Sequence, residues 1–460
     1  MSQTPTSSNL MSFPPGFLWG AASGACQIEG SPLADGAVCG NWLEWTRTAA
    51  APNLETASNH YASMESDVAL MKQLGLKSYR FSISWPRVMP ARGAINERGL
   101  DFYRRLIDAL NDAEIVPHAT LFHYETPAWA RGGWENRDTA LAFNEYSQVI
   151  FRELGRSVPL WSTQSDAGMV AQRGYLWGTF PPGKQDRVAF IKAVHHLNLA
   201  HGLAVDSYRQ MGLEGEIGTA AVLALCRPVH DGRYAIQDAR NIQSLLVEAF
   251  LDPLAGKGYP AFLFDFSGEQ AAYYEKDPRL IHRPVDFLGV NHCPRNYANF
   301  SPGLNIVDND FTVPTGLPVS DLGGPVVSDD LHGLLIYLAR NYSYESLFIT
   351  KNGVPMRDSQ RSPREAIEDD LRIHYLGHCL LQVKRALDDG VPLRGYYVWS
   401  LMDHVEWSQG YDPRFGLIHV DFETWRRTLK KSATWYRSLM AQNGFDPDQL
   451  PREPAYRLSS

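Results

Sequence analysis

The feature that most constrains the fold of this 460-residue chain is a regular alternation of short apolar segments and longer amphipathic ones. Eight apolar segments, rich in β-branched and aromatic residues, have the composition of buried strands. They span residues 16–23, 77–84, 116–124, 158–165, 216–224, 285–293, 346–353 and 393–402. The segments between them, such as 65–76, 99–113, 139–155 and 366–390, have apolar residues at helical spacing. Eight alternating strand and helix units are what a closed (β/α)8 TIM barrel requires, and the sequence predicts that fold.

The domain organisation follows from the absence of any linker, low-complexity tract or internal repeat in the chain. A hydrophobic content of 44% is enough for one large core. We expect a polar, disordered segment at residues 1–12, a single barrel domain with long βα loops at 13–445, and a C-terminal tail at 446–460. Such barrels place their chemistry at the C-terminal ends of the strands. Functional residues are therefore sought where each apolar segment ends.

Composition excludes several classes of function. The net charge of −8 disfavours nucleic acid and anionic membranes as partners. No apolar run is long enough to span a bilayer, and the polar N-terminus lacks the features of a signal peptide. The five scattered cysteines form neither a metal motif nor a disulfide ladder, so we expect a cytoplasmic protein without metal or cofactor. They are Cys26, Cys39, Cys226, Cys293 and Cys379.

Four longer stretches resemble one known family. They are "FPPGFLWGAASGACQIEG", "YRFSISWPRVMP", "GYYVWSLMDHVEWSQGYDPRFGLIHVDFET" and "RRTLKKSATWY". In this order they are similar to the family 1 glycoside hydrolases, and the resemblance runs from about Phe13 to Met440. It implies a barrel that cleaves β-glycosides with retention of configuration, using two glutamates at the ends of the fourth and seventh strands.

Neither of those two glutamates is found at its expected place. Where the resemblance implies the acid/base, "WSTQSDAG" has Asp166, preceded by Ser165 in place of asparagine; where it implies the nucleophile, "FITKNG" has Lys351. A retaining glycosidase needs two carboxyl groups roughly 5 Å apart. An ammonium is not a nucleophile, and it repels the positive charge that develops on the sugar. The two substitutions therefore predict that retaining hydrolysis is lost.

Other positions match the part of the family site that holds a sugar. The matching residues are Gln27, Arg80, His123, Trp399, Glu406 and Trp407, of which Arg80 is implied to lie beside the nucleophile. Their amide, imidazole and carboxylate groups suit hydroxyl groups, and indole faces suit the apolar face of a pyranose. The positions around the anomeric carbon have changed: Tyr124 stands for a tryptophan, Ser165 for an asparagine, and His292 and Cys293 for two tyrosines that follow the matching Asn291. Tyr124, Ser165 and Asn291 are further candidate ligand-binding residues.

Two interpretations of Lys351 remain open. It forms an ion pair with Asp166 that neutralises both charges, or crowding by Arg80 lowers its pKa so that it forms a Schiff base or acts as a general base. His292 and Cys293 are further candidate catalytic residues, each with a structural alternative as a hydrogen-bonded histidine and a small filler. The candidate catalytic set is thus Asp166, Lys351, His292 and Cys293.

The leading functional hypothesis is a glycosidase-like barrel repurposed for non-hydrolytic, for example biosynthetic, chemistry on a sugar-like or other metabolite. The changed positions carry reactive groups rather than alanine or glycine, which favours this hypothesis over its alternatives. One alternative is a pseudoenzyme that binds carbohydrate without catalysis, and another is a β-glycosidase with weak activity or an altered mechanism. The expected partner in each case is a small sugar or sugar-like molecule, and no motif indicates an oligomeric state.

Overall fold

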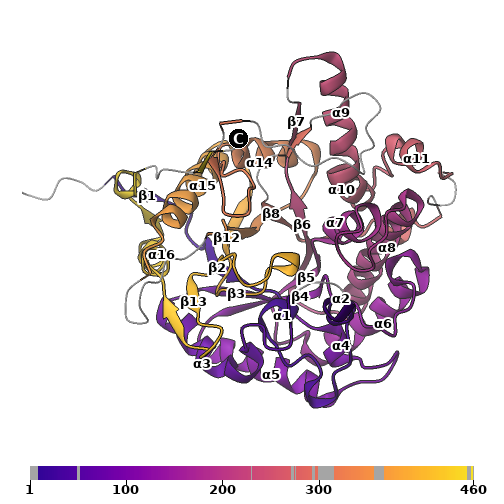
Figure 1. Cartoon of the computed structure of the whole chain (residues 1–460), viewed down its shortest axis with the longest axis horizontal. Coiled ribbons are helices and arrows are strands. Elements are labelled where there is room, and N and C mark those ends of the chain that lie inside the picture. The colour runs from indigo at the N-terminus through magenta and orange to yellow at the C-terminus, as the bar shows by residue number, and fades with distance from the viewer. Residues whose placement is uncertain are drawn as a thin grey trace, which may run out of the picture.

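Eight parallel strands close into a barrel in the computed structural model of the chain (Figure 1). The structure describes residues 9–48, 52–228, 230–270, 274, 276–292, 296–298, 315–316, 318–356, 367–452 and 457–458. The barrel strands are β2 (Leu18–Ala22), β3 (Ser78–Ser82), β4 (Val116–His123), β5 (Leu160–Ser165), β6 (Glu216–Leu223), β8 (Phe287–His292), β11 (Leu347–Asn352) and β12 (Leu393–Trp399). Each lies within one of the eight apolar segments, so the predicted single-domain (β/α)8 barrel is confirmed.

The strands follow one another around the barrel in chain order. Pairing of β12 with β2 closes it, with Trp19 opposite Tyr396 and Ala22 opposite Trp399. Register shifts interrupt the pairing of β11 with both of its neighbours near Lys351, and the pairing of β5 with β6 before Ser165. Such irregularities re-aim side chains at barrel rims. They occur here at the two strand ends where the sequence analysis looked for chemistry.

Helices surround the barrel (Figure 1). The longer ones are α3 (His60–Leu74), α5 (Glu97–Asp112), α6 (Arg137–Leu154), α8 (Arg187–Gln210), α9 (Arg233–Gln243), α14 (Asp330–Asn341), α15 (Asp370–Asp388) and α16 (Lys431–Gln442). The shorter ones include α1 (Ala25–Ile28), α2 (Asn41–Thr48), α4 (Trp85–Val88), α7 (Ala167–Ala171), α10 (Ala249–Leu254), α11 (Ala261–Ser267) and α13 (Pro278–Ile281). In α5, Tyr103, Leu106 and Leu110 are buried at helical spacing, which explains the amphipathic pattern seen in the sequence.

The interior of the barrel is filled by side chains rather than open. One apolar cluster joins residues from five different barrel strands, and such residues can meet only inside the barrel. Its strand members are Ala22, Leu160, Phe287, Phe348, Tyr397 and Trp399. His118 lies among them and contacts the hydroxyl groups of Tyr397 and Ser162. This packed floor confines any ligand to the C-terminal mouth.

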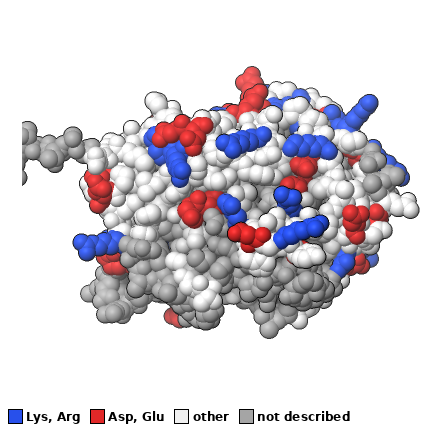
Figure 2. All heavy atoms as spheres, turned by 90° about the horizontal axis from the view of Figure 1, so that it is seen from above, with Lys and Arg blue, Asp and Glu red and all other residues white. Residues whose placement is uncertain are grey.

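Short strand pairs outside the barrel tie its ends and loops together. β1 (Met11–Ser12) pairs with β15 (Gly444–Phe445), β7 (Cys226–Pro228) with β9 (Asn296–Ala298), β10 (Pro318–Val319) with β16 (Arg457–Leu458), and β13 (Ile418–Val420) with β14 (Arg427–Leu429). Acidic and basic side chains are interspersed over the described part of the face in Figure 2. Within the described residues, no helix has both the length and the apolar character needed to cross a bilayer.

Candidate active site

A cavity of about 390 Å³ lies at the C-terminal ends of the strands. Seven of the predicted site residues line it, together with residues of the surrounding loops. The predicted residues are Tyr124, Asn291, His292, Lys351, Trp399, Glu406 and Trp407. Five others are buried next to these residues without lining the cavity themselves. They are Gln27, Arg80, His123, Ser165 and Asp166.

The centre of this group is an ion pair between Lys351 and Asp166. Lys351 Nζ lies 3.3 Å from Asp166 Oδ2 and 3.9 Å from the centroid of the Trp399 ring. The Asp166 side chain is completely buried, whereas 19% of the Lys351 side chain is exposed. The structure thus contains the ion pair that was the first of the two interpretations of Lys351.

Asp166 is held in its ionised form by its neighbours. Burial raises the pKa of this carboxyl, but attraction to Lys351 and contacts with His123 and Asn291 outweigh burial and bring the pKa well below its ordinary value. The Tyr124 hydroxyl donates to Oδ2 at 3.4 Å, and the Asn291 amide donates to Oδ1. Asp166 is therefore a carboxylate at neutral pH, which can stabilise positive charge and has no proton to donate.

Asn291 fixes the orientation of this carboxylate. Its side-chain Nδ2 also donates to Ser165 Oγ at 3.1 Å, while its Oδ1 accepts from Thr350 Oγ1 at 2.8 Å. Because the amide nitrogen donates to Ser165 on β5 and the amide oxygen accepts from Thr350 on β11, only one orientation of the amide satisfies both of its ends. Ser165, which stands where the family pattern has asparagine, is thereby part of the support of Asp166.

His123 and Arg80 are buried next to the ion pair. Burial, together with repulsion from Lys351 and Arg80, lowers the pKa of His123 to about 4, so this imidazole is neutral at pH 7. Burial lowers the pKa of Arg80 to about 10, although Asp166 opposes the shift. Arg80 therefore stays charged, and its Nη1 donates to the carbonyl oxygen of Thr350 at 3.3 Å.

Glu406 is a carboxylate that lines the cavity together with Lys351. It accepts from His404 at 3.0 Å and from Gln27 at 3.4 Å. Burial raises the pKa of Glu406, but the His404 contact and the charges of Lys351 and Arg173 outweigh burial and lower it. Gln27 donates to the Val405 carbonyl, and its own carbonyl oxygen is buried without a partner among the described residues. Glu406 is thus an acceptor that lines the cavity, supported from behind by the buried Gln27.

Aromatic rings form one wall of the cavity. Trp407 packs on Tyr124, with ring centroids 4.6 Å apart, and on Trp42 at 4.4 Å. Phe180 lies edge-on to Trp42 at 4.9 Å. Rings packed in this way offer an apolar surface whose orientation is fixed by their mutual contacts.

His292 and Cys293 are the remaining candidates. His292 accepts from Asn352 Nδ2 through Nδ1 at 2.9 Å, which directs its Nε2 toward Asp330 Oδ1 at 3.4 Å. Its imidazole lines the cavity while both of its nitrogens face protein groups. Cys293 lies outside the described residues. Among the described residues, no group of three or more histidine, cysteine or acidic side chains could hold a metal ion.

The sequence analysis missed one charged residue of the cavity, Arg173. It lies on a π-helical turn, η3 (Gln172–Leu176), which continues α7. The helix α7 itself begins directly after Asp166. The guanidinium carbon of Arg173 lies 4.9 Å from the centroid of the Phe180 ring. The spacing of Arg173 from Asp166 could have indicated it. Asp166 lies at a strand end, and a residue seven positions later on the helix that follows lies on the same side, two turns further on.

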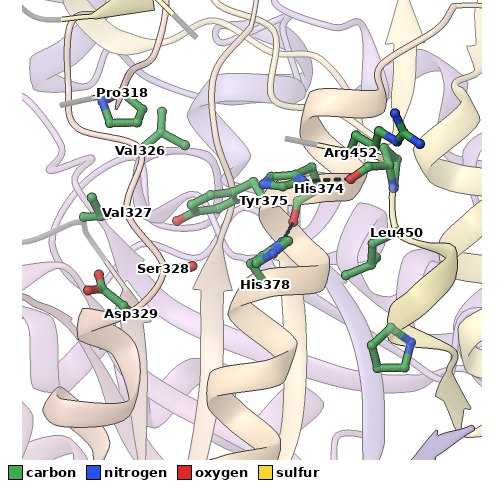
Figure 3. A pocket seen from close by; sticks show the side chains of 12 residues that line it. Pro318, Val326, Val327, Ser328, Asp329, His374, Tyr375, His378, Leu450 and Arg452 are labelled. Carbon is green, nitrogen blue, oxygen red and sulfur yellow. Dashed lines mark hydrogen bonds between the residues drawn. The ribbon is translucent and has the colours of Figure 1, made fainter. Parts of the chain in front are cut away.

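A second cavity, of about 600 Å³, lies between α15 and the segment 447–452 (Figure 3). His374 and His378 stack there with ring centroids 4.0 Å apart, and His374 donates to the Pro451 carbonyl. Tyr375 lines this cavity and the barrel cavity, so it separates the two. None of the predicted site residues lines the second cavity.

Comparison with known proteins places the chain in a family. Residues 10–445 match the model of glycosyl hydrolase family 1, and the chain belongs to this family. It is 38% identical over 453 residues to Beta-glucosidase A of Acetivibrio thermocellus, covering 95% of this chain and 99% of that protein. The family 1 β-glucosidase of Thermotoga maritima, a solved structure, has a TM-score of 0.91 and 35% identity and covers 95% of this chain and 100% of its own.

These relatives overturn the leading functional hypothesis. Proteins named β-glucosidases, at 36–38% identity over 95% of the chain, point to β-glucosidase activity. The prediction of a barrel that has lost hydrolysis and been repurposed is therefore wrong, as is its alternative, a carbohydrate-binding pseudoenzyme. That prediction gave too much weight to Lys351 and Asp166. Trp399, Glu406 and Trp407 line one cavity, and Asp166 still provides a buried, ionised carboxylate.

Proposed function

We propose that this chain hydrolyses β-glucosides, with the glucosyl unit held in the cavity between Glu406 and the ion pair of Lys351 with Asp166. The observation that carries the proposal is the carboxylate of Asp166, which is completely buried and kept ionised beside Lys351. A permanent negative charge in a low-dielectric site stabilises the oxocarbenium-like charge that develops when a glycosidic bond breaks.

The two groups of the ion pair take complementary roles. Asp166 accepts a proton from the attacking water, whose oxygen bonds to the anomeric carbon as the glycosidic C–O bond breaks. Lys351 donates its ammonium proton to the departing oxygen. When the contact of 3.3 Å forms again, the proton on Asp166 returns to Lys351 and both groups are restored.

Substrate entry is expected to separate this pair. In hydrolases that invert configuration, acid and base lie roughly 6.5–9.5 Å apart so that water and the glycosidic bond fit between them. Trp399 holds the Lys351 ammonium from one side, and only Asp166 pairs with it among the described carboxylates. These positions are where the resemblance implies two glutamates, so the proposed chemistry uses a carboxylate and an ammonium in their place.

The sugar is held by the part of the cavity that Glu406 lines. Glu406 accepts from its hydroxyl groups, and the indole of Trp399 packs on the pyranose. The β-glucosidase of T. maritima has been solved in complex with deoxynojirimycin, at 35% identity and a TM-score of 0.89. That complex supports a small, sugar-like ligand for this cavity.

The test is hydrolysis of 4-nitrophenyl β-D-glucoside by the wild type and by Asp166→Asn. We expect turnover by the wild type and a loss of about 10²-fold or more in the variant. Asparagine tolerates the left-handed backbone of Asp166, where φ is 61°, so the variant should fold. Asp35→Asn is the matched control, because Asp35 has φ 55° and an exposed side chain, and it should keep full activity. Absence of turnover on any β-glycoside, or full activity of Asp166→Asn, would contradict the proposal.

A further inference from the structure

Arg173 is a charged residue of the cavity whose function the proposed reaction does not explain. Its Nε is buried and has no hydrogen-bond partner within the part of the chain that the structure describes. A buried donor without a partner costs roughly 1–3 kcal/mol, unless a ligand satisfies it. Arg173 lines the same cavity as Lys351 and Glu406, so a ligand bound there can reach it.

The position of the Arg173 guanidinium is fixed by its surroundings. It stacks on Phe180, which in turn packs against Trp42 in the aromatic wall. Stacking on a ring leaves the in-plane N–H groups of a guanidinium free to point sideways, in the fork that matches a carboxylate. Arg173 is thus oriented before a ligand arrives, which reduces the entropy lost on binding.

The charges of the cavity leave Arg173 without a counter-charge of its own. Lys351 is paired with Asp166, and no described carboxylate forms an ion pair with Arg173. Glu406 is close enough for the charge of Arg173 to lower its pKa, but it is bonded to His404 and Gln27 instead. An anionic group on the ligand would therefore be attracted to Arg173.

The anion is expected on the part of the substrate that is not the sugar. The glucosyl unit in the proposed function binds against Glu406, and this carboxylate would repel an acidic group on the sugar itself. Arg173 lines the cavity together with Lys351, which protonates the departing oxygen in the proposed reaction, and so belongs to the wall on the aglycone side. A group attached through the glycosidic oxygen can approach this wall without approaching Glu406.

We propose that Arg173 makes the cavity selective for β-glucosides whose aglycone carries a carboxylate or a similar anion. This inference rests on the proposed function, because it assumes that the sugar binds against Glu406. A bidentate contact from Arg173 to the anion would pair the buried Nε and add a charge-assisted hydrogen bond. Arg173 acts on substrate choice and takes no part in bond cleavage.

The experiment measures binding without hydrolysis. Calorimetric titration compares 4-carboxyphenyl β-thioglucoside with its neutral 4-carboxamidophenyl analogue, since S-linked glycosides resist cleavage. We expect the wild type to bind the carboxylate about tenfold or more tightly, and Arg173→Gln to lose that preference. Arg173→Lys, which keeps the charge but not the fork, should retain part of it. Arg187→Gln is the matched control, because Arg187 also stacks on a phenylalanine, Phe266 at 4.6 Å, outside the cavity.

The possible results separate the two proposals. Equal affinity of the wild type for both thioglucosides, or an undiminished preference in Arg173→Gln, would overturn the inference. A preference for 4-nitrophenyl β-glucuronide over the β-glucoside would also overturn it, since the anion would then be on the sugar. If the carboxylate preference depends on Arg173 but no β-glucoside is hydrolysed, the inference stands and the proposed hydrolysis fails.

Discussion

Lys351 and Asp166 approach to 3.3 Å although their strands are not neighbours, since β6 and β8 lie between β5 and β11 in the barrel. Side chains of such strands can meet only above the barrel axis, where all the strand ends converge. The ion pair therefore joins the two halves of the mouth, and it lies at the point where a glycosidic bond would be cleaved. Changes to either partner are expected to alter both the charge of the site and the reaction.

Lys351→Glu is expected to increase hydrolysis of β-glucosides that have poor leaving groups. Two carboxyl groups this close cannot both ionise, so one would keep its proton and act as a stronger acid than an ammonium. We expect about 10²-fold faster hydrolysis of methyl β-glucoside, measured by release of glucose.

The control for this change is Lys351→Gln. It removes the ammonium without adding a carboxyl group, and should show no gain on methyl β-glucoside. A Lys351→Glu enzyme that is slower than the wild type on alkyl glucosides would show that the ammonium is the better acid in this site.

The lowered pKa of Asp166 predicts that acid reduces the free energy of unfolding. A carboxyl whose pKa is lower in the folded state stabilises the fold above its unfolded pKa of about 3.9, and this stabilisation is lost as the pH falls through the folded value. Denaturant titrations at pH 3, 4 and 6 should show a steeper loss of stability toward acid in the wild type than in Asp166→Asn. Parallel curves for the two proteins would contradict the assignment.

Glu125 should have the opposite effect on stability. Burial and repulsion by Glu29 raise its pKa to about 7, although a hydrogen bond from Ser84 opposes the shift. When the pKa of a carboxyl is higher in the folded state, the free energy of unfolding falls as the pH rises from about 4.3 through 7, because only the folded state keeps the proton. Glu125→Gln cannot ionise, so it should gain on the order of 3 kcal/mol of unfolding free energy relative to the wild type between pH 4 and 8. A constant difference between the two proteins over that range would refute this.

The loop that carries Glu406 depends on a buried ion pair. Lys430 Nζ lies 2.8 Å from Asp403 Oδ1, and both side chains have no exposed surface. Lys430→Met would leave the Asp403 carboxylate with weaker contacts from Arg414 and His419, and should cost about 3–5 kcal/mol in a urea titration. Lys431→Met is the control, because the neighbouring Lys431 is half exposed and should change stability by less than about 1 kcal/mol.

The barrel could be predicted from the sequence because each buried strand has a local signal. Residues 346–353, for example, are apolar and end at a turn, and β11 forms within them whatever lies on either side. The position of Lys351 at a strand end was predictable for the same reason. Its ion pair with Asp166 was one of the two interpretations left open, and it followed from the family resemblance rather than from a local pattern, because it joins the ends of two strands that are not neighbours.

Arg173 shows a second limit of local patterns. An arginine on a helix after a strand usually lies in solvent, and its stacking on Phe180 depends on the path of the chain between residues 173 and 180. The functional hypothesis failed for a different reason. It treated the identity of two residues as decisive, whereas their environment keeps a reactive carboxylate in place.

The pairing of β1 with β15 also has a consequence for the order of the chain. Met11 lies opposite Phe445, and Asn443 bonds to the backbone of Phe13 and to the indole of Trp19, so the first and last units of the barrel are held side by side. Each unit therefore has the same two neighbours whichever one comes first in the sequence. A circularly permuted chain, with residues 11 and 445 joined by a short linker and new ends placed in an exposed loop, would preserve the pairing of all eight barrel strands.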